Sequence, residues 1–512
     1  MPTPAAPPSR LWGILPPWLI IAVVTVACRV PSFFRPLFDD DEAQYAAIGE
    51  LVRHGGMLYG DGGVDFKPPG IYWTYAAVFG AAGRYAMWAM HLVALLVVLA
   101  TAWILAGLAA RIVRESDTTA GAPALERAAR VTTGVLYAVF TTVYYPKMLA
   151  ANTEIFMMLA LAGMTWLTLW ARDAGLGRAC LALASAGALV AIASAYKQSA
   201  AANLIVIAAG VLATRAWLGR LVAAGAGFAA MLGLGALVVI ATSSFSAMWH
   251  WCVTQVVGKY GAGAWHGSVV HNVLVGLLPF VASSLIVWIA GALALGRVRT
   301  SRAGERVVWV WFALSLASSF AGGHFFGHYF IQPLAPLAVI AGLELARRRA
   351  RRWLTRVAIV LTAVPAVGFF VFNVVFEPIT ESFGAPSPDF RAPVAWVRDH
   401  TQPDDRIFVW GMFPPMYVLA DRLPASRFVG FMRGAERNHN VPPEVGWDTG
   451  PEVWPALAED FAAHPPAIVI DTSTADYMSF GHYPIARFPE VAALLATYKP
   501  VATVGGVTML AR

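Results

Sequence analysis

Four consecutive acidic residues and one lysine follow the first apolar segment of the chain. Asp39-Asp40-Asp41-Glu42 is followed by Lys67-Pro68-Pro69-Gly70, in a sequence that is 58% hydrophobic and 13% charged. Carboxylates can accept a proton or bind a metal ion, and a lysine ammonium group can neutralise a phosphate. These groups together suit a reaction in which a sugar leaves a lipid phosphate.

The elements that must position these residues are membrane spans. The chain has 512 residues and a mean hydropathy of +0.61, which is typical of a polytopic membrane protein. A helix needs about 20 apolar residues to cross the bilayer. We predict about eleven transmembrane helices, near residues 11–30, 85–110, 131–146, 148–171, 178–196, 198–216, 221–242, 271–296, 306–322, 327–346 and 354–376.

The arginines account for the net charge of +7 and set the expected orientation. They cluster in five short loops between predicted spans, which the positive-inside rule places in the cytoplasm. This position favours a membrane role for the charge and gives no reason to expect nucleic acid as a partner. The N-terminus is then inside and the C-terminal part outside.

Several ionisable residues fall at the predicted external ends of spans. Glu154, Lys197, His328 and the loop that contains Asp41 share that side, so they can face one cavity. Ionisable groups in or beside spans are costly and are candidates for function. The alternative is that Glu154 and Lys197 are paired charges at helix ends, and that Asp39 and Asp40 form a helix cap or a solvated run.

The first outer loop, residues 31–84, is expected to lie on the membrane surface. Residues 41–52 are typical of a short amphipathic helix with Asp41 near its N-terminus, where the helix dipole favours acids. The aromatic run Ile71-Tyr72-Trp73-Thr74-Tyr75 suits a second helix in the headgroup region.

A change of composition after Phe376 indicates a second domain. Residues 406–411 and 467–471 are expected to be strands, with a helix over residues 451–463 between them and a hairpin over 498–504 and 507–510. We therefore predict a transmembrane domain over residues 1–376 and an α/β extracytoplasmic domain over 377–512.

The ordered motifs of the first loop resemble those of the GT-C membrane glycosyltransferases. The motifs are Asp41-Glu42-x-x-Tyr45-Ala46, then Gly56-x-x-Tyr59-x-Asp61, then Asp65-x-Lys67-Pro68-Pro69 with Tyr72-Trp73. The resemblance is to the branch of protein O-mannosyltransferases and lipid A aminoarabinose transferases. It continues through Asn152-Thr153-Glu154, Tyr196-Lys197-Gln198, Lys259-Tyr260 and Gly327-His328-Tyr329-Phe330, and covers roughly residues 11–349.

The resemblance implies an inverting transfer of one sugar from a polyprenyl-phosphate donor. Asp41 would act on the acceptor hydroxyl, supported by Glu42 and Glu154. The donor phosphate would be bound by a set of basic and aromatic residues, Lys67, Tyr329, Lys259, Lys197 and His328. Acceptor or sugar contacts would come from Tyr45, Asp65 and Tyr72.

Two departures from the family pattern affect the cofactor prediction. Asp40 stands where relatives commonly have Pro, and Glu154 stands where Asp is often found. The extra carboxylate leaves a divalent cation open as a cofactor, although we assign no metal ligands. The scattered histidines and three cysteines lack the spacing of a zinc site.

The resemblance implies three kinds of partner: the lipid-linked sugar donor, the bilayer, and an acceptor that is a glycolipid, a glycan or a protein. The expected location is the cytoplasmic (inner) membrane, with the active site facing outward. Two alternatives remain, a flippase or transporter of lipid-linked sugars and a glycan ligase or polymerase with the same donor chemistry. The sequence names neither the sugar nor the acceptor.

Overall fold

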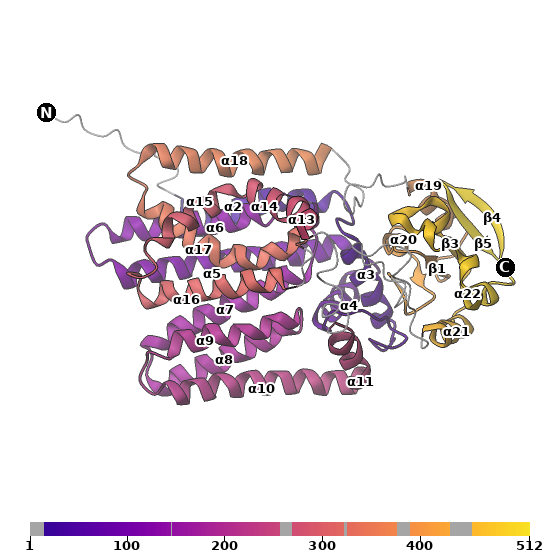
Figure 1. Cartoon of the computed structure of the whole chain (residues 1–512), viewed down its shortest axis with the longest axis horizontal. Helices are drawn as coiled ribbons and strands as arrows, with labels where there is room; N and C mark the ends of the chain where they lie inside the picture. The colour runs from indigo at the N-terminus through magenta and orange to yellow at the C-terminus, as the bar shows by residue number, and fades with distance from the viewer. Residues whose placement is uncertain (1–14, 145, 257–268, 322–324, 376–389, 431–452) are drawn as a thin grey trace.

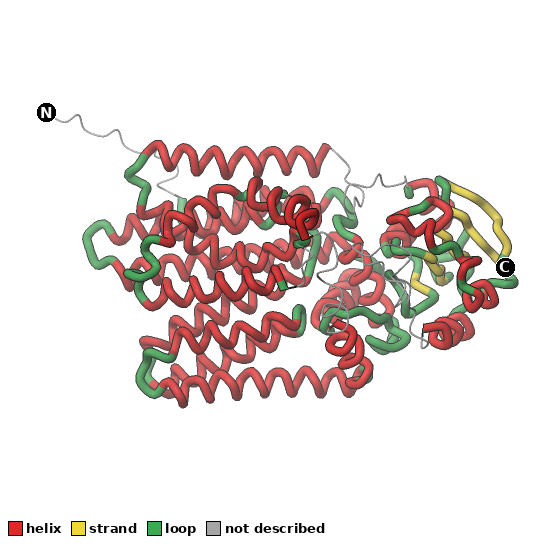
Figure 2. The backbone as a smooth tube through the Cα atoms, in the orientation of Figure 1, coloured by secondary structure: helices red, strands yellow, loops and turns green. Residues whose placement is uncertain are grey.

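Long helices lie side by side over most of the molecule, and a small sheet lies at one end (Figure 1). The structure is a computed structural model that describes residues 15–144, 146–256, 269–321, 325–375, 390–430 and 453–512. All the strands of the described residues lie at that end, as Figure 2 shows in yellow. The predicted domain boundary between residues 376 and 377 lies at the edge of a segment that is not described.

The first half of the helical part begins with an apolar helix and includes two shorter helices, over residues 40–53 and 70–82, that lie between the bundle and the sheet part (Figure 1). The elements are α2 (Pro17–Arg29), η1 (Val30–Phe33), α3 (Asp40–Arg53), α4 (Gly70–Ala82), α5 (Met87–Ser116), α6 (Ala122–Phe140), η2 (Pro146–Met148), α7 (Thr153–Asp173), α8 (Leu176–Ser194), η3 (Gln198–Asn203), α9 (Leu204–Val211) and α10 (Trp217–Thr242).

The second half of the helical part contains two π-helical turns. Its elements are α11 (Phe245–Trp249), the π-helix η4 (His250–Thr254), α13 (Val269–Asn272), the π-helix η5 (Val273–Leu277), α14 (Leu278–Ser283), α15 (Leu285–Leu295), α16 (Ala303–Phe320), η6 (Gly327–Phe330), α17 (Ile331–Arg347) and α18 (Arg352–Val375).

Six helices among the described residues are long and apolar enough to cross a membrane. They are α5, α7, α8, α10, η6 with α17, and α18. A seventh span would be the bent pair 270–283 and 285–295, whose halves meet at 81°. The other predicted spans fall on α2, α6, α9 and α16, which are shorter or more polar. The predicted count of eleven spans is therefore not confirmed, although each predicted span corresponds to a helix.

The centre of the bundle is apolar and closely packed. α17 packs against α6, α15 and α16, and its side chains are almost all buried. α10 and α18 lie at the two flanks of the bundle in Figure 1 and leave most of their apolar residues uncovered. Such uncovered apolar surface suits contact with lipid tails. The loops after α5, α7, α9, α15 and α17, which hold the predicted cytoplasmic arginines, lie at the end away from the sheet (Figure 1).

The helices α3 and α4 form as expected, but α3 does not lie on the membrane surface. Every residue of α3 from Glu42 to Leu51 is buried, and Ile71, Tyr72 and Tyr75 of α4 are also buried. One apolar core joins these helices to the sheet part, with Ile48 and Phe408 in the same cluster. The prediction of a surface helix was wrong because protein, rather than headgroups, covers the second face of α3.

The sheet part is built around two buried parallel strands. Its elements are α19 (Arg391–Asp399), β1 (Arg406–Trp410), α20 (Pro415–Ala420), β2 (Leu423–Pro424), α21 (Val453–Ala463), β3 (Ile468–Asp471), η7 (Thr472–Ala475), η8 (Tyr477–His482), η9 (Ile485–Arg487), α22 (Pro489–Leu494), β4 (Lys499–Val504) and β5 (Val507–Ala511). The strand order is β2-β1-β3-β5-β4. β1 pairs in parallel with β2 and β3, whereas β5 is antiparallel to β3 and β4.

The strands, the hairpin and the helix predicted for this region are all present. Residues Val453–Ala463 form α21, and the described part of the predicted helix begins there. Gly505 and Gly506 turn the hairpin with positive φ angles of 59° and 82°, which glycine adopts readily.

Candidate active site

The site is organised by the first turn of α3. Asp39 is the N-cap, and its carboxylate accepts a hydrogen bond from the amide of Asp41 at 3.3 Å. The same carboxylate is paired with Lys147 Nζ at 2.5 Å and accepts a bond from Asn152 Nδ2 at 3.1 Å. Asp39 is therefore a helix cap, as the structural alternative predicted, and also a link to the segment before α7.

Asp41 is a partly accessible carboxylate of this turn. Its side chain is 41% exposed, and its Oδ2 lies 3.9 Å from His328 Nε2. Burial in the site works to raise its pKa, but the positive charges of Lys147, Lys67 and His328 outweigh that effect, so the net pKa lies below the ordinary value. Asp41 is thus held as an ionised base, which is the state that proton abstraction requires.

Glu42 faces a different environment from Asp41. It is fully buried and accepts hydrogen bonds from the amides of Phe38 at 2.9 Å and Ala151 at 2.8 Å. His91 Nε2 of α5 lies 2.9 Å from the same carboxylate. These contacts hold α3 against α5 and the segment before α7, so the observed role of Glu42 is to position the helix that carries Asp41.

Glu154, Lys197 and Tyr329 form a second charged group. Glu154 is buried in the first turn of α7 and pairs with Lys197 Nζ at 2.6 Å. Lys197 Nζ also lies 3.8 Å from the centre of the Tyr329 ring, which packs against His328. The pairing foreseen as the structural alternative for Glu154 and Lys197 is present, yet it lies beside Tyr329 and His328, within the predicted site.

Lys67 lies in a loop that its own carbonyl group anchors. Tyr59 Oη donates to this carbonyl at 2.8 Å and Cys252 Sγ donates at 3.3 Å. Gln198 Nε2 donates to the carbonyl groups of Phe66 and Cys252, at 2.9 Å each. The positive charge of Lys67 acts on Asp41 and Asp65. The loop therefore presents an ammonium group close to Asp41.

The three residues predicted to contact the acceptor or the sugar are buried between α3 and α4. Tyr72 Oη donates to Asp65, and the rings of Tyr45 and Tyr72 meet edge to face at 5.8 Å. Burial raises the pKa of Asp65 against the opposing charge of Lys67. Their observed contacts are with one another, and their role as acceptor or sugar contacts stays a prediction.

Not every candidate residue is described. Lys259 lies outside the described residues. Within the described residues, no group of three or more His, Cys, Asp or Glu side chains is arranged to hold a metal ion. The structure therefore supplies no ligand set for the divalent cation that the sequence left open.

Two residues at the site were not singled out in the sequence, namely Lys147 and His91, whereas Asn152 and Gln198 belong to motifs that carry the resemblance. One signal could have found Lys147. The chain has only five lysines against many arginines, and three of the five, Lys67, Lys147 and Lys197, surround Asp41. His91 lies inside a predicted span, so nothing in the sequence distinguished it from packing residues.

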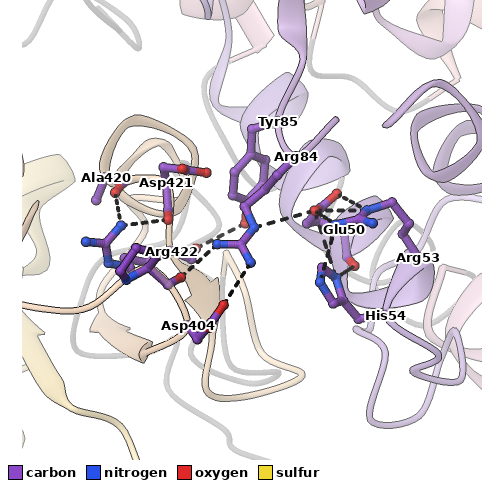
Figure 3. Close-up of polar contacts among 10 residues, drawn as sticks. Glu50, Arg53, His54, Arg84, Tyr85, Asp404, Ala420, Asp421 and Arg422 are labelled. Carbon is purple, nitrogen blue, oxygen red and sulfur yellow. Dashed lines mark hydrogen bonds and ion pairs between the residues drawn. The ribbon is translucent and has the colours of Figure 1, made fainter. Parts of the chain in front are cut away.

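The sheet part is fixed onto the back of α3 by a polar network (Figure 3). Buried Glu50 pairs with Arg53 at 2.5 Å and lies 3.9 Å from Arg84 Nε. Arg84 also donates to the carbonyl of Pro403 at 2.7 Å. Tyr85 Oη donates to the carbonyl of Arg422 at 3.1 Å. The sheet part therefore holds the far end of the helix whose first turn carries Asp41.

Comparison with known proteins gives structural relatives only. No family model and no curated protein matches the sequence. ArnT from Cupriavidus metallidurans bound to undecaprenyl phosphate matches with a TM-score of 0.62 and 14% identity, over 98% of each chain. The apo state of the same protein gives a TM-score of 0.54.

A second match is to an archaeal enzyme. The oligosaccharyltransferase AglB from Archaeoglobus fulgidus, in complex with an inhibitory peptide and a dolichol-phosphate, gives a TM-score of 0.53 and 13% identity. The match covers 93% of this chain and 71% of AglB. Identities this low establish the fold alone. The chain is therefore a multi-pass membrane protein with the GT-C fold and a C-terminal α/β domain, as the sequence predicted.

Proposed function

We propose that the protein is an inverting glycosyltransferase that moves a sugar from a polyprenyl-phosphate donor to an acceptor hydroxyl or phosphate. The reaction would take place at the outer face of the cytoplasmic membrane, on the side opposite the arginine-rich loops. A glycolipid, a glycan or a protein would serve as acceptor.

The observation that carries the proposal is the environment of Asp41. An accessible carboxylate with a lowered pKa stands within reach of the charges of Lys147 and Lys67, with His328 beside it. A base needs an accessible ionised carboxylate, and a departing phosphate needs positive charge nearby. The fold relative ArnT was crystallised with undecaprenyl phosphate, which supports a lipid phosphate as ligand.

In the proposed step, the acceptor oxygen attacks the anomeric carbon of the sugar. Asp41 takes the proton of the acceptor hydroxyl as the new carbon–oxygen bond forms; a phosphate acceptor, already ionised, would attack without this proton transfer. The bond between the anomeric carbon and the phosphate oxygen breaks, and its electron pair stays on the phosphate. Attack from the face opposite the leaving group inverts the configuration. The phosphate is a good leaving group, so the step needs no general acid.

The positively charged residues near Asp41 would have different roles in the reaction. Lys67 would stabilise the charge that grows on the phosphate, with His328 and Tyr329 as further contacts. Lys197 is paired with Glu154, so its first role is to compensate that buried carboxylate. Glu154 would then hold Lys197 beside Tyr329. Lys259 remains a candidate phosphate contact from the sequence resemblance.

The test is a transfer assay with the full chain in detergent. The protein is incubated with a panel of polyprenyl-phosphate sugars and with glycolipid, glycan and peptide acceptors, products are followed by mass spectrometry, and their anomeric configuration is assigned by NMR. We expect a product with inverted configuration for the wild type and for Asp399→Asn, whose side chain is exposed on α19. Asp41→Asn should yield almost none.

Two outcomes would contradict the proposal. Equal activity of Asp41→Asn and wild type would remove Asp41 as the base. No transfer from any donor, combined with movement of the lipid-linked sugar across liposome membranes, would favour the flippase alternative. A product extended by many sugars would instead point to a ligase or polymerase with the same chemistry.

A further inference from the structure

Lys147 lies beside the proposed base, but the proposed transfer step gives it no contact with donor or acceptor. Its Nζ lies 2.5 Å from Asp39 Oδ1, and its side chain is 14% exposed. The second oxygen of Asp39 accepts from Asn152 Nδ2, whose amide nitrogen also donates to the carbonyl of Lys147 at 3.3 Å. A closed polar triangle therefore joins the cap of α3 to the segment that precedes α7.

This triangle is attached directly to Asp41. The Asp39 carboxylate that binds Lys147 also accepts the amide hydrogen of Asp41 at 3.3 Å. The ammonium group is therefore fixed relative to the first turn of α3 through a residue only two positions from Asp41. The N-cap hydrogen bond of Asp39 therefore ties the Lys147 pair to the backbone of the accessible acid.

Asp41 is faced by charged groups from several elements. η2 contributes Lys147, the loop before α4 contributes Lys67, η6 contributes His328 and α7 contributes Glu154, while Asp39 precedes it on the same helix. Lys197 adds a further positive charge. Among the cations, Lys147 has the largest effect on the pKa of Asp41, ahead of Lys67 and His328.

The three lysines near Asp41 have different partners, which indicates different roles. Lys197 is bound to Glu154, and Lys67 stands on a loop anchored to η4 and η3. Lys147 is held by the carboxylate that caps α3. A bound lipid phosphate would meet Lys67 without disturbing this pair.

We propose that Lys147, held by Asp39, is a positioning residue that keeps Asp41 ionised and correctly oriented toward the acceptor. The part that concerns the acceptor rests on the proposed transferase function. The effect of Lys147 on the ionisation of Asp41 does not, and it can be measured without any substrate.

The substrate-free test measures the protonation of Asp41 by chemical labelling. A water-soluble carbodiimide activates protonated carboxyl groups, and an added amine then labels them. The full-length protein in detergent is labelled between pH 2 and 8, and mass spectrometry of the peptide from Val30 to Arg53 assigns the label to each acid. We compare wild type with Lys147→Met, Lys147→Arg and the exposed control Lys499→Met.

Loss of the opposing charge should keep Asp41 protonated to higher pH. We expect the labelling curve of Asp41 in Lys147→Met to move upward by about one pH unit or more, because a nearby opposite charge shifts a carboxyl group by that order. Lys147→Arg and Lys499→Met should match the wild type within about 0.3 pH unit. An unchanged curve in Lys147→Met would overturn the proposal, whatever reaction the protein performs.

A second variant guards against misfolding. Lys147→Met leaves the buried Asp39 carboxylate without its cation, which can destabilise the protein. The double variant Asp39→Asn/Lys147→Met removes this unpaired charge and is compared with Asp39→Asn, so that the two proteins differ only in Lys147, and the upward shift at Asp41 is expected between them. An unchanged curve between these two variants would again contradict the proposal.

Binding of undecaprenyl phosphate separates positioning from phosphate recognition. We expect Lys67→Met to weaken binding of this lipid at least about tenfold, whereas Lys147→Met should weaken it less than about threefold. In the transfer assay, the acid limb of kcat/KM should move to higher pH in Lys147→Met. Loss of undecaprenyl phosphate binding in Lys147→Met as large as in Lys67→Met would make Lys147 a phosphate ligand and reject the positioning role.

Discussion

The buried ion pairs beside Asp41 and the pair at the arginine-rich end of the helix bundle are built from different cations. At the arginine-rich end, Arg347 binds Glu305 through two parallel hydrogen bonds of 3.0 and 2.7 Å. At the end near the sheet, Lys147 and Lys197 each meet a buried carboxylate through one ammonium group. Arginine holds a carboxylate in a fixed fork, whereas lysine is a compact point charge.

The choice of arginine or lysine corresponds to the different functions of the two regions. The Arg347–Glu305 pair at the arginine-rich end joins α16 to α17. The lysines near Asp41 also act on the charge of an accessible acid. A compact point charge can shift the pKa of a neighbouring carboxyl group and can bind a phosphate. We therefore infer that the arginine pair stabilises the helix packing, whereas the lysines serve the reaction.

The largest expected effect separates the two ends by function. Asp41→Asn should lower kcat by about 10²–10⁴-fold, because it removes the proposed general base. Glu305→Gln, which also removes one carboxylate charge, should leave kcat of the folded enzyme unchanged. The measurement is the rate of sugar transfer by each purified variant, normalised to folded protein. A similar loss of kcat in Glu305→Gln would contradict a purely structural role for the pair at the arginine-rich end.

The second prediction separates the two ends by stability. Arg347→Met leaves Glu305 buried without its partner and should lower the free energy of unfolding by about 3–5 kcal/mol. The double variant Glu305→Gln/Arg347→Met should recover part of this loss. Thermal unfolding in detergent checks both. A stability unchanged in Arg347→Met would show that the pair is not structural.

The third prediction exchanges the cations without changing the charge. Lys67→Arg should lower kcat/KM by about tenfold to a hundredfold, because the larger planar group displaces the phosphate from its position. The reverse exchange at the other end, Arg348→Lys, should leave the transfer rate as it is. Steady-state kinetics of the two variants provide the test, and equal tolerance at both positions would count against the division of roles.

The smallest expected effect is a pH dependence of stability at Asp39. Burial raises the pKa of this carboxyl group to about 7, despite the opposing charge of Lys147. A group whose pKa is raised on folding binds its proton more tightly in the folded state, so its contribution is present at low pH and is lost as the pH rises through about 7. Thermal unfolding should therefore occur at a higher temperature at pH 6 than at pH 8.

Asp39→Asn supplies the control for that measurement, because its side chain does not titrate. The difference between pH 6 and pH 8 should be smaller in this variant than in the wild type. The arginine-rich end should contribute little to the difference, since its buried acids are held by guanidinium groups that stay charged across this range. An identical pH dependence in both proteins would place the titrating group elsewhere.

The sequence by itself determined the class of protein, the helices of the bundle and the strands of the C-terminal part. Apolar runs of span length and the alternation of strand and helix signals are local properties, so they can be read without the fold. The motifs around Asp41 and Lys67 also directed attention to the right turn and loop.

Only the tertiary structure decided how the acids divide their roles. Asp39, Asp41 and Glu42 are neighbours in the sequence, yet their partners come from η2, η6 and α5, far along the chain. Protonation depends on burial and on charges within a few ångströms, which a linear pattern does not contain. The covering of α3 by the sheet part is likewise a long-range contact, and it explains why a helix expected at the membrane surface is buried instead.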